Sequence, residues 1–412
     1  MDAALFMCIS IRDIRSARTR IADGVALTPC LESIPLSEIT GSRVYCKLES
    51  HQRTGSFKER GARNALLQLS REQRTRGVVA ASAGNHASAL AYHGQLLDIP
   101  VTVVMPVTAP LIKISTCERL GARIVLHGAD FAEARARADS LVDEEGLTYV
   151  NGYDDPAVIA GQGTIGLEIL EQVPKVEAIV IPVGGGGLIA GIATAVKAVR
   201  PKVEIIGVES MHTTGFSAAQ KAGHPVRTHP KPTLADGLAV PQFGSNAFGL
   251  ATTHVDRLVR VSEDLIALAI LRMLELEKDV VEGAAAATLA ALLSRKLPDL
   301  QQRNVVLVIG GGNIDPLVLS RVIEKGLVAD GRRCRFTAMI SDRPGGLAKL
   351  TRVIAEAGAN VTDILHERAF SGPDVSKVQA ICTVETRDAG HIRHLLRTLK
   401  REGFAVRRSD PG

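Results

Sequence analysis

The sequence predicts an α/β fold of parallel strands covered by helices, followed by a smaller α+β unit. Short runs of β-branched and aliphatic residues alternate with longer helical stretches through most of the 412 residues. These runs are apolar on both faces, as expected for parallel strands buried between layers of helices. After the basic stretch Gly331–Arg335 the order of the elements changes. A chain of this length also exceeds one ordinary hydrophobic core, so more than one domain is expected.

The part of the chain before this basic stretch supplies the alternating elements. A helix is expected over 12–22, an extended segment starts at Thr28, and a strand over 44–49 leads into a polar loop. The later strands are expected at 78–81, 101–106, 123–127, 178–183, 204–209 and 305–310. The helices are expected at 85–98, 111–120, 131–144, 164–172, 188–199, 263–276, 283–293 and 317–325. Residues 212–250, rich in Gly, Pro, His and Thr, are predicted to be irregular.

The segment after the basic stretch has the element order of a ferredoxin-like fold. The sequence predicts strands at 336–341, 360–367, 377–385 and 404–408, and helices at 346–356 and 389–401. The order β-α-β-β-α-β over about 75 residues is that of the split βαβ unit. We therefore expect a domain at 1–328 with a smaller subdomain at about 45–150, a linker at 329–334 and a second domain at 335–412.

Composition excludes several classes of function. The net charge is only +5, and no basic stripe with interleaved aromatic residues suggests nucleic-acid binding. No apolar run approaches the ~18 residues that cross a bilayer, so a membrane protein is not expected. The cysteines are scattered, which favours reduced thiols in the cytoplasm over disulfides or a metal site. They are Cys8, Cys30, Cys46, Cys117, Cys334 and Cys382.

Lys58 is the first candidate for chemistry. It follows Thr54, Gly55 and Phe57 in a short polar loop, just before an expected helix. Most lysines in such places are solvated surface charges. The glycine-rich turns elsewhere in the chain favour another interpretation, in which this lysine forms an imine with a phosphorylated cofactor.

Four consecutive glycines, Gly184, Gly185, Gly186 and Gly187, lie between an expected strand and an expected helix that begins near Leu188. Unobstructed N–H groups and the positive end of a helix dipole make such a turn a place for a phosphate. The alternative is a merely tight turn. The spacing fits neither the dinucleotide fingerprint nor the P-loop, so a small phosphorylated cofactor is favoured.

Two other strand-to-helix junctions carry polar groups. Ser82, Gly84, Asn85 and His86 offer a hydroxyl, an amide, an imidazole and N–H groups that suit a carboxylate, although Ser82 or Asn85 could simply cap the helix. The last expected strand of the first domain ends in the run 310–315, G-G-G-N-I-D, which could equally be a turn with a capping residue.

Together these stretches resemble the fold-type II pyridoxal-phosphate enzymes, whose fold is that of the tryptophan synthase β chain, and most of all the threonine/serine dehydratases (threonine ammonia-lyases). The resemblance extends over about 10–328. Its motifs are S-F-K-E-R-G-A at 56–62, S-A-G-N-H-A at 82–87, G-Q-G-T-I-G-L-E-I at 161–169, G-G-G-G-L at 184–188 and G-G-N-I-D at 311–315. The tail resembles an ACT domain through D-R-P-G-G-L at 342–347 and A-G-A-N-V at 357–361.

The resemblance implies roles for particular residues. Lys58 would hold pyridoxal 5'-phosphate as a Schiff base and later remove the Cα proton of the substrate, while Phe57 would pack near the ring and Asn85 would bind its phenolic oxygen. The backbone of 184–188 would hold the phosphate. Ser82, Gly84 and His86 would grip the substrate carboxylate.

Three positions depart from the patterns of related enzymes. Ala83 stands where serine racemases place a proton-donating serine, which favours elimination over racemisation. Gly310 stands where the family usually places Ser or Cys against the pyridine nitrogen. Glu209 matches a metal ligand of racemase-like members, but Gly215 replaces its aspartate partner, so no metal is predicted.

The leading hypothesis is a dehydratase that converts L-threonine to 2-oxobutanoate and ammonia. A dehydratase of L-serine or another β-hydroxy amino acid and a catalytically silent amino-acid sensor stay open as alternatives. The resemblance to an ACT domain implies an amino-acid effector, with isoleucine or valine as the natural candidates for a biosynthetic enzyme. Candidate effector residues are Asp342, Gly345, Gly346, Leu347 and Asn360. Apolar faces in this tail also predict a homo-oligomer.

Overall fold

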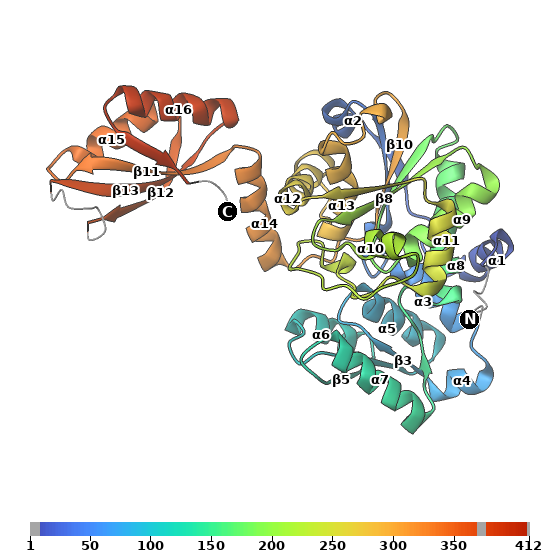
Figure 1. Ribbon diagram of the computed structural model, residues 1–412. Coiled ribbons are helices and arrows are strands. Elements are labelled where there is room, and N and C mark those ends of the chain that lie inside the picture. The colour runs from blue at the N-terminus through green and yellow to red at the C-terminus, as the bar shows by residue number, and fades with distance from the viewer. Residues whose placement is uncertain (1–8, 369–375, 410–412) are drawn as a thin grey trace. The chain divides into compact units, whose positions relative to one another are not determined.

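A computed structural model describes residues 9–368 and 376–409 of the chain (Figure 1). The chain forms two compact units, Met1–Asp315 and Pro316–Gly412. This division differs from the boundary expected at 328. Helix α14 (Pro316–Ala329) contacts strand β11 (Arg333–Ser341) and so belongs to the second unit, and the last two residues of the expected linker already lie in β11.

The first unit contains a six-stranded sheet with the order β1-β2-β10-β7-β8-β9. All neighbouring pairs are parallel except β1 and β2, which are antiparallel. The strands are β1 (Cys30–Ser33), β2 (Arg43–Leu48), β7 (Ala178–Pro182), β8 (Glu204–Ser210), β9 (Arg257–Val261) and β10 (Asn304–Ile309). Strands β7 and β10 lie in the middle and are almost wholly apolar, as burial on both faces requires.

A second sheet of the first unit is parallel and has the order β5-β4-β3-β6. Its strands are β3 (Val78–Ala81), β4 (Val101–Met105), β5 (Arg123–Leu126) and β6 (Thr148–Tyr149). The smaller subdomain was expected to begin near residue 45, but β2 pairs with β1 and β10 of the large sheet. The strand that leads to Lys58 therefore belongs to the large sheet, because its register is fixed by a partner more than 250 residues later in the chain.

Helices cover both sheets of the first unit. Those near the smaller sheet are α3 (Lys58–Leu67), α4 (Arg71–Arg76), α5 (Asn85–Leu97), α6 (Leu111–Arg119) and α7 (Phe131–Glu145), several of which are labelled in Figure 1. The others are α1 (Ile11–Ile21), α2 (Ile34–Thr40), α8 (Pro156–Gln172), α9 (Gly187–Val199), α10 (Gly215–Ala222), α11 (Ser245–His254), α12 (Glu263–Arg272) and α13 (Gly283–Leu293). Short 3₁₀ turns lie at 49–51, 236–238 and 298–300, and a π-helical turn at 273–277 follows α12.

Two expectations about these helices are wrong. Helix α8 begins at Pro156, eight residues before the expected start, and Asp155 caps it by accepting from the N–H groups of Ala157 and Val158. Its glycines look like loop residues in the sequence, but a Cβ at Gly161 would lie 2.6 Å from the backbone oxygen of Arg60. Glycine here permits two helices to approach closely. The region expected to be irregular, 212–250, contains α10 and part of α11.

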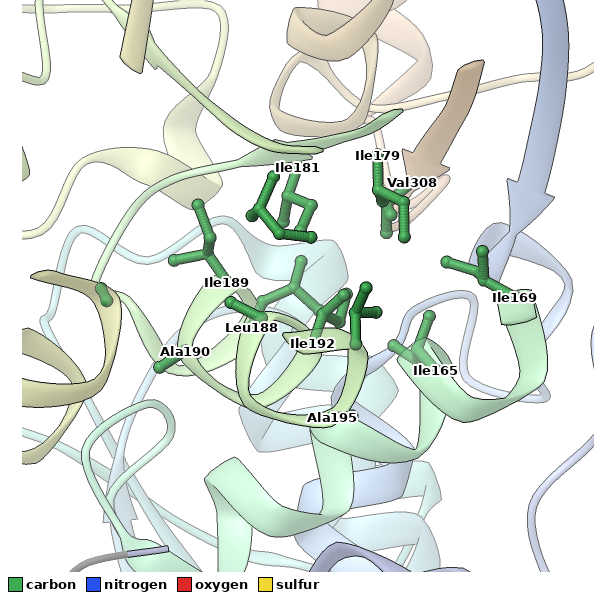
Figure 2. Close-up of a cluster of buried hydrophobic side chains, with 14 of the residues drawn as sticks. Ile165, Ile169, Ile179, Ile181, Leu188, Ile189, Ala190, Ile192, Ala195 and Val308 are labelled. Atoms are coloured by element: carbon green, nitrogen blue, oxygen red, sulfur yellow. The ribbon is translucent and has the colours of Figure 1, made fainter. Parts of the chain in front are cut away.

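Aliphatic side chains build the main core. Figure 2 shows Ile165 and Ile169 of α8 and Ile189 and Ile192 of α9 beneath strands β7 and β10, from which Ile179, Ile181 and Val308 point toward the helices. All seven side chains are fully buried. This layer of helices and strands holds the amino end of α9 in place without tryptophan, because close packing of branched aliphatic side chains is sufficient.

The second unit is an antiparallel four-stranded sheet with the order β12-β13-β11-β14. Its further elements are β12 (Asn360–Glu367), β13 (Lys377–Glu385), β14 (Ala405–Arg408), α15 (Gly346–Glu356) and α16 (Ala389–Arg401). The element order confirms the ferredoxin-like prediction. Among the described residues of both units, no helix has the length and apolar character needed to cross a bilayer.

Candidate active site

A cavity of about 330 Å³ lies at the carboxyl ends of strands from both sheets of the first unit. The segments that follow β3, β7 and β10 line it, together with the first turn of α3. Ligands of α/β proteins bind at this edge of a sheet. The structure brings every residue expected to hold the cofactor or the substrate carboxylate to this cavity.

Lys58 is the first residue of α3, and its half-buried side chain enters the cavity. Its Nζ donates to the carbonyl oxygen of Gly152 at 2.5 Å and lies 5.2 Å from the centre of the Phe57 ring. Burial lowers the pKa of Lys58 to about 8, and the nearby carboxyl of Glu282 opposes this shift. A larger fraction of this amine is therefore neutral near pH 7 than of an ordinary lysine.

The glycine turn before α9 is shaped by its neighbours. Gly186 has a φ of +99°, and a Cβ there would lie 2.2 Å from the Cζ of Phe243. A Cβ at Gly185 would lie 2.3 Å from the Cγ of Tyr153. Within the described part of the chain, no group accepts a hydrogen bond from the backbone N–H groups of 184–188. These donors lie at the start of a 13-residue helix and line the cavity, which suits an anion.

No side chain of the turn after β3 caps helix α5. Helix α5 has Gly84 at its N-cap position, with no side-chain capping bond, and Ser82 Oγ accepts from the N–H of Gly84 at 3.3 Å. The buried His86 ring has its Nε2 2.9 Å from the carbonyl oxygen of Val150, and burial lowers its pKa to about 3. An uncharged ring in this position supports the neighbouring turn and brings no positive charge to a carboxylate.

Asn85 lies in a chain of polar contacts. Its Nδ2 donates to both carboxyl oxygens of the buried Glu282, each at 3.0 Å. Its Oδ1 accepts from Nδ2 of Asn313 at 2.9 Å. Burial raises the pKa of Glu282 to about 7, although the hydrogen bond from Asn85 opposes this. A carboxyl group that changes protonation near neutral pH therefore lies inside the cavity.

Gly310 brings no side chain to the cavity, and the nearest atom to a Cβ built there is Cδ1 of Phe57, at 3.3 Å. Its carbonyl oxygen accepts from the N–H of Phe57 at 2.9 Å, so the end of β10 is tied to the lysine loop. A Cβ at the next residue, Gly311, would lie 2.8 Å from Oε1 of Glu282. The carboxyl group of Glu282 therefore lies against this glycine turn.

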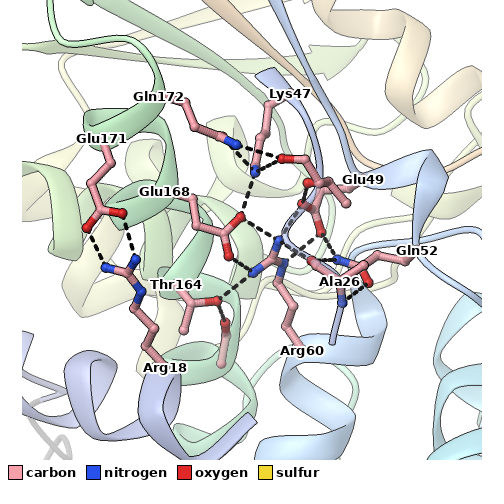
Figure 3. A network of polar contacts seen from close by, with 12 residues as sticks. Arg18, Ala26, Lys47, Glu49, Gln52, Arg60, Thr164, Glu168, Glu171 and Gln172 are labelled. Carbon is pink, nitrogen blue, oxygen red and sulfur yellow. Dashed lines mark hydrogen bonds and ion pairs between the residues drawn. The ribbon is translucent and has the colours of Figure 1, made fainter. Parts of the chain in front are cut away.

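A buried ionic network links helix α3 to the segment after β2 and to helix α8. Figure 3 shows the guanidinium of Arg60 between the carboxylates of Glu49 and Glu168, with four contacts of 2.5 to 2.8 Å. Lys47 Nζ donates to Glu168 at 2.6 Å. Two positive and two negative groups balance here in the protein interior, where an unpaired charge would be costly. The network fixes the helix two residues after Lys58.

Two sets of residues considered above lie outside the cavity. Within one chain the structure does not bring Asn360 close to the turn at 342–347. Asn360 is paired with Glu385 at the Arg333 end of the second unit's sheet, whereas the turn follows Ser341, at the other end of β11. Glu209, considered above as a metal ligand, accepts from the N–H groups of residues 216 and 217 and so caps α10.

The turn at 342–347 itself joins β11 to α15. Gly345 has a φ of +92° at the N-cap position of α15, and a Cβ at Gly346 would lie 2.1 Å from the carbonyl oxygen of Ser341. Asp342 is bound by Arg368, with contacts of 3.1 to 3.2 Å, and Leu347 is exposed. The glycines are therefore required by the turn, whatever it binds.

Sequence reasoning missed several residues that line the cavity, and three of them contact the residues described above. Glu282 follows Val280 and Val281 and precedes an alanine-rich helix, and a lone acidic residue in such an apolar run was the available signal. Gly152 and Tyr153 follow β6 in a short segment that contains an Asn-Gly pair, which is typical of a turn. Neither signal indicates on its own which other segments these residues meet.

Comparison with known proteins agrees with this site. Residues 21–311 match the family described as pyridoxal-phosphate dependent enzymes, and residues 339–403 match the ACT domain. The chain is 44% identical over 399 residues to an L-threonine ammonia-lyase of Thermotoga maritima, covering 97% of this chain and 99% of the relative. It is 43% identical over 326 residues to a catabolic L-threonine dehydratase of Staphylococcus aureus, covering 78% and 94%.

Solved structures give the same result. A threonine deaminase from Solanum lycopersicum superimposes with a TM-score of 0.74 at 37% identity, over 79% of this chain and 94% of that one. A serine racemase from Dictyostelium discoideum gives 0.71 at 33% identity, over 74% and 99%. The chain therefore belongs to the pyridoxal-phosphate-dependent enzymes of the threonine ammonia-lyase family and carries a C-terminal ACT domain.

Proposed function

We propose that this protein converts L-threonine to 2-oxobutanoate and ammonia with pyridoxal 5'-phosphate as its cofactor. The observation that carries the proposal is the meeting of a lysine amine, a turn of free N–H donors and an amide group in one cavity. The named function of relatives that are 44% identical over nearly the whole chain supports the choice of substrate.

The residues of the cavity fit this cofactor. The unpaired N–H groups of 184–188 suit a phosphate dianion, and side chains at Gly185 or Gly186 would fill the turn. The amine of Lys58 suits the cofactor's aldehyde, and the Nδ2 of Asn85 suits its phenolic oxygen. Gly310 offers no side chain to the pyridine nitrogen.

The chain's own residues would perform the proton transfers. When bound, pyridoxal phosphate disperses the negative charge that develops on the substrate's Cα. Lys58, with a pKa lowered by burial to about 8, is suited to accept the Cα proton near neutral pH. The carbonyl oxygen of Gly152 holds its Nζ in the cavity at 2.5 Å. Ala83 has no proton to donate to the opposite face, which favours loss of the β-hydroxyl over racemisation.

The turn at 82–86 is our candidate for the substrate carboxylate. Gly84 has no atom within 4 Å of a built Cβ, so a ligand can approach its backbone closely. Ser82 contributes a hydroxyl beside the start of α5. His86 acts in our proposal as a neutral support of the turn at Gly152, because its Nε2 is taken by a backbone carbonyl.

Regulation and assembly belong to the same proposal. The ACT domain supports binding of an amino-acid effector at the turn 342–347, and isoleucine and valine are the first to test. Asn360 would join that site only as a residue of a second chain, since within one chain it lies at the opposite end of the sheet from the turn. We also expect a homo-oligomer in the cytoplasm.

A spectroscopic assay tests the function. The purified chain with pyridoxal phosphate should absorb near the visible edge, and L-threonine should change the band while 2-oxobutanoate forms. Lys58→Ala should lose both the band and the activity, whereas Lys175→Ala, at an exposed turn, should keep them. A wild-type band without any keto acid would refute the proposed reaction.

The choice between threonine and serine requires kinetics. One methyl group is worth only about 1–3 kcal/mol of discrimination, so both substrates should react. We expect a higher kcat/KM for L-threonine. A preference of more than tenfold for L-serine, or for a third β-hydroxy amino acid, would replace L-threonine as the assigned substrate and leave the reaction type unchanged.

A further inference from the structure

The Asn85 side chain is held between two groups that fix which end of its amide faces the cavity. On one side lies the carboxyl of Glu282, whose two oxygens each accept a hydrogen bond from Asn85 Nδ2 at 3.0 Å. On the other side lies Asn313, whose Nδ2 donates to Oδ1 of Asn85 at 2.9 Å. In its ionised form, which prevails above its pKa of about 7, the carboxyl of Glu282 can only accept hydrogen bonds, so it selects the nitrogen end of the Asn85 amide.

The direction of Asn313 is fixed in turn by the lysine loop. Its Nδ2 also donates to the backbone carbonyl oxygen of Thr54 at 2.7 Å, and a carbonyl can only accept. Its Oδ1 lies against Gly55, where a Cβ would be only 2.5 Å away, and Gly55 has a φ of +75°. Glycine at position 55 therefore permits the Asn313 side chain to contact the backbone of the loop that carries Lys58.

The contacts form one chain in which the direction of donation changes once, at Asn313. It runs from the Thr54 carbonyl through the amide groups of Asn313 and Asn85 to the carboxylate of Glu282. Both ends accept, so Asn313 must donate from its Nδ2 to both neighbours, while Asn85 accepts from Asn313 and donates to Glu282. The backbone is tied alongside it, because Glu282 donates its N–H to the Gly311 carbonyl and Gly312 donates to the Gly55 carbonyl.

We propose that Asn313 and Glu282 are positioning residues that lock the Asn85 amide so that its N–H₂ group, and not its carbonyl oxygen, is offered to a ligand oxygen in the cavity. Nδ2 carries two hydrogens, and one remains for the ligand while the other is shared by Glu282. This inference rests on the proposed function, since the ligand oxygen is the phenolic oxygen of pyridoxal phosphate. Asn85 reversed would present an acceptor to that oxygen and repel it.

The test uses variants that change which direction of the Asn85 amide its neighbours favour. Asn313→Asp replaces the donor with an acceptor, so Asn85 can no longer satisfy both neighbours in its present direction. Asn313→Asp combined with Glu282→Gln allows both contacts of the Asn85 amide to form again with Asn85 reversed. Both variants lose the same contact to Thr54, and Glu282→Gln alone measures the effect of removing the charge near Lys58, so the three variants together isolate the direction of Asn85. Asn304→Asp, the same substitution at the opposite end of β10, is the control.

We expect Asn313→Asp to weaken pyridoxal phosphate binding by about 10- to 100-fold, the effect of one hydrogen bond to a charged group, and to move the visible band. The double variant should recover thermal stability but not affinity or band position. Affinity for inorganic phosphate should stay at the wild-type value in both, because the glycine turn is untouched. The control loses a hydrogen bond to Glu177 at the surface, far from the cavity, and should match the wild type in pyridoxal phosphate affinity and band position.

Two results would overturn the lock. The first is an Asn313→Asp variant with wild-type affinity and band. The second is a double variant in which affinity returns together with stability, because a purely structural role predicts that both recover. A wild-type chain that takes up no pyridoxal phosphate would refute the cofactor assignment itself, and this inference with it.

Discussion

Lys58 combines burial with one defined hydrogen bond, and this combination has a measurable pH dependence. Its pKa is lowered to about 8 from an ordinary 10.5 because protein surrounds the amine. Only the neutral amine attacks an aldehyde, so uptake of pyridoxal phosphate by cofactor-free protein should accelerate as the pH rises through about 8. Stopped-flow absorption between pH 6 and pH 10 would measure this. A rate that still rises about tenfold per pH unit up to pH 10 would mean that the site does not lower the pKa of the lysine.

Arg60 has a different task at the same scale. Replacing it with alanine leaves the buried carboxylates of Glu49 and Glu168 with too little positive charge, and we expect a loss of about 3–5 kcal/mol in the free energy of unfolding. Arg18, also drawn in Figure 3, pairs with Glu171 at the surface, so Arg18→Ala should cost less than about 1 kcal/mol.

Urea unfolding of both variants would compare the buried and the exposed ion pair directly. The measurement should be made on the cofactor-free protein, so that altered ligand binding does not add to the difference. Equal losses for Arg60→Ala and Arg18→Ala would show that burial of the network contributes nothing to its strength.

Among the elements, the turn before α9 is the most sensitive to change. Gly186→Ala puts a side chain at a φ of +99° and against Phe243, so a stability loss of about 1–3 kcal/mol and weakened cofactor binding are expected. Gly215→Ala makes the same change at the start of α10, where a Cβ meets no atom within 4 Å, and should be nearly neutral. Thermal unfolding and a pyridoxal phosphate titration would measure both. Wild-type affinity in Gly186→Ala would argue against the phosphate site.

Elements with their own periodic pattern were predictable, and elements held by distant partners were not. Strands β7 and β10 are almost wholly apolar runs, which are plain in the sequence. Helix α11 escaped prediction because its first turn is capped by Asp154, about 90 residues earlier, which accepts from the N–H groups of Ser245 and Ala247. Helix α10 is capped by Glu209, which lies 7 residues before Phe216 at the end of β8 rather than at the N-cap position.

The residues of the candidate site also differ in whether the local sequence indicates them. The glycine turn and Lys58 carry local signals, because unusual backbone and an isolated lysine beside a turn are visible in the sequence. The contact of Glu282 with Asn85 spans 197 residues and has no local signal. Asn313 was visible only as a possible capping residue, since nothing in its neighbourhood indicates that it lies on the lysine loop.

At the scale of the whole molecule, the two units have separate apolar cores. We expect two transitions in calorimetry of the full chain. Pyridoxal phosphate should raise the transition temperature of the first unit only, because at a free concentration of 100 Kd it adds about 2.7 kcal/mol to that unit's free energy of unfolding. An amino-acid effector should raise the other. A single transition that moves as a whole with either ligand would mean that the units unfold as one.

The place of β10 in the large sheet has a consequence for how the protein is made. This strand is the last of its sheet to leave the ribosome, yet it lies between β2 and β7, with Val305 opposite both Val44 and Ala178. Until it emerges, the nascent chain holds two half-sheets with open edges, and edges of this kind pair readily with other chains. The smaller sheet, complete within 78–149, can form while the rest is still being translated. Synthesis must therefore pass through a vulnerable interval that ends only when β10 closes the sheet and delivers Gly310 and Asn313 to the cavity.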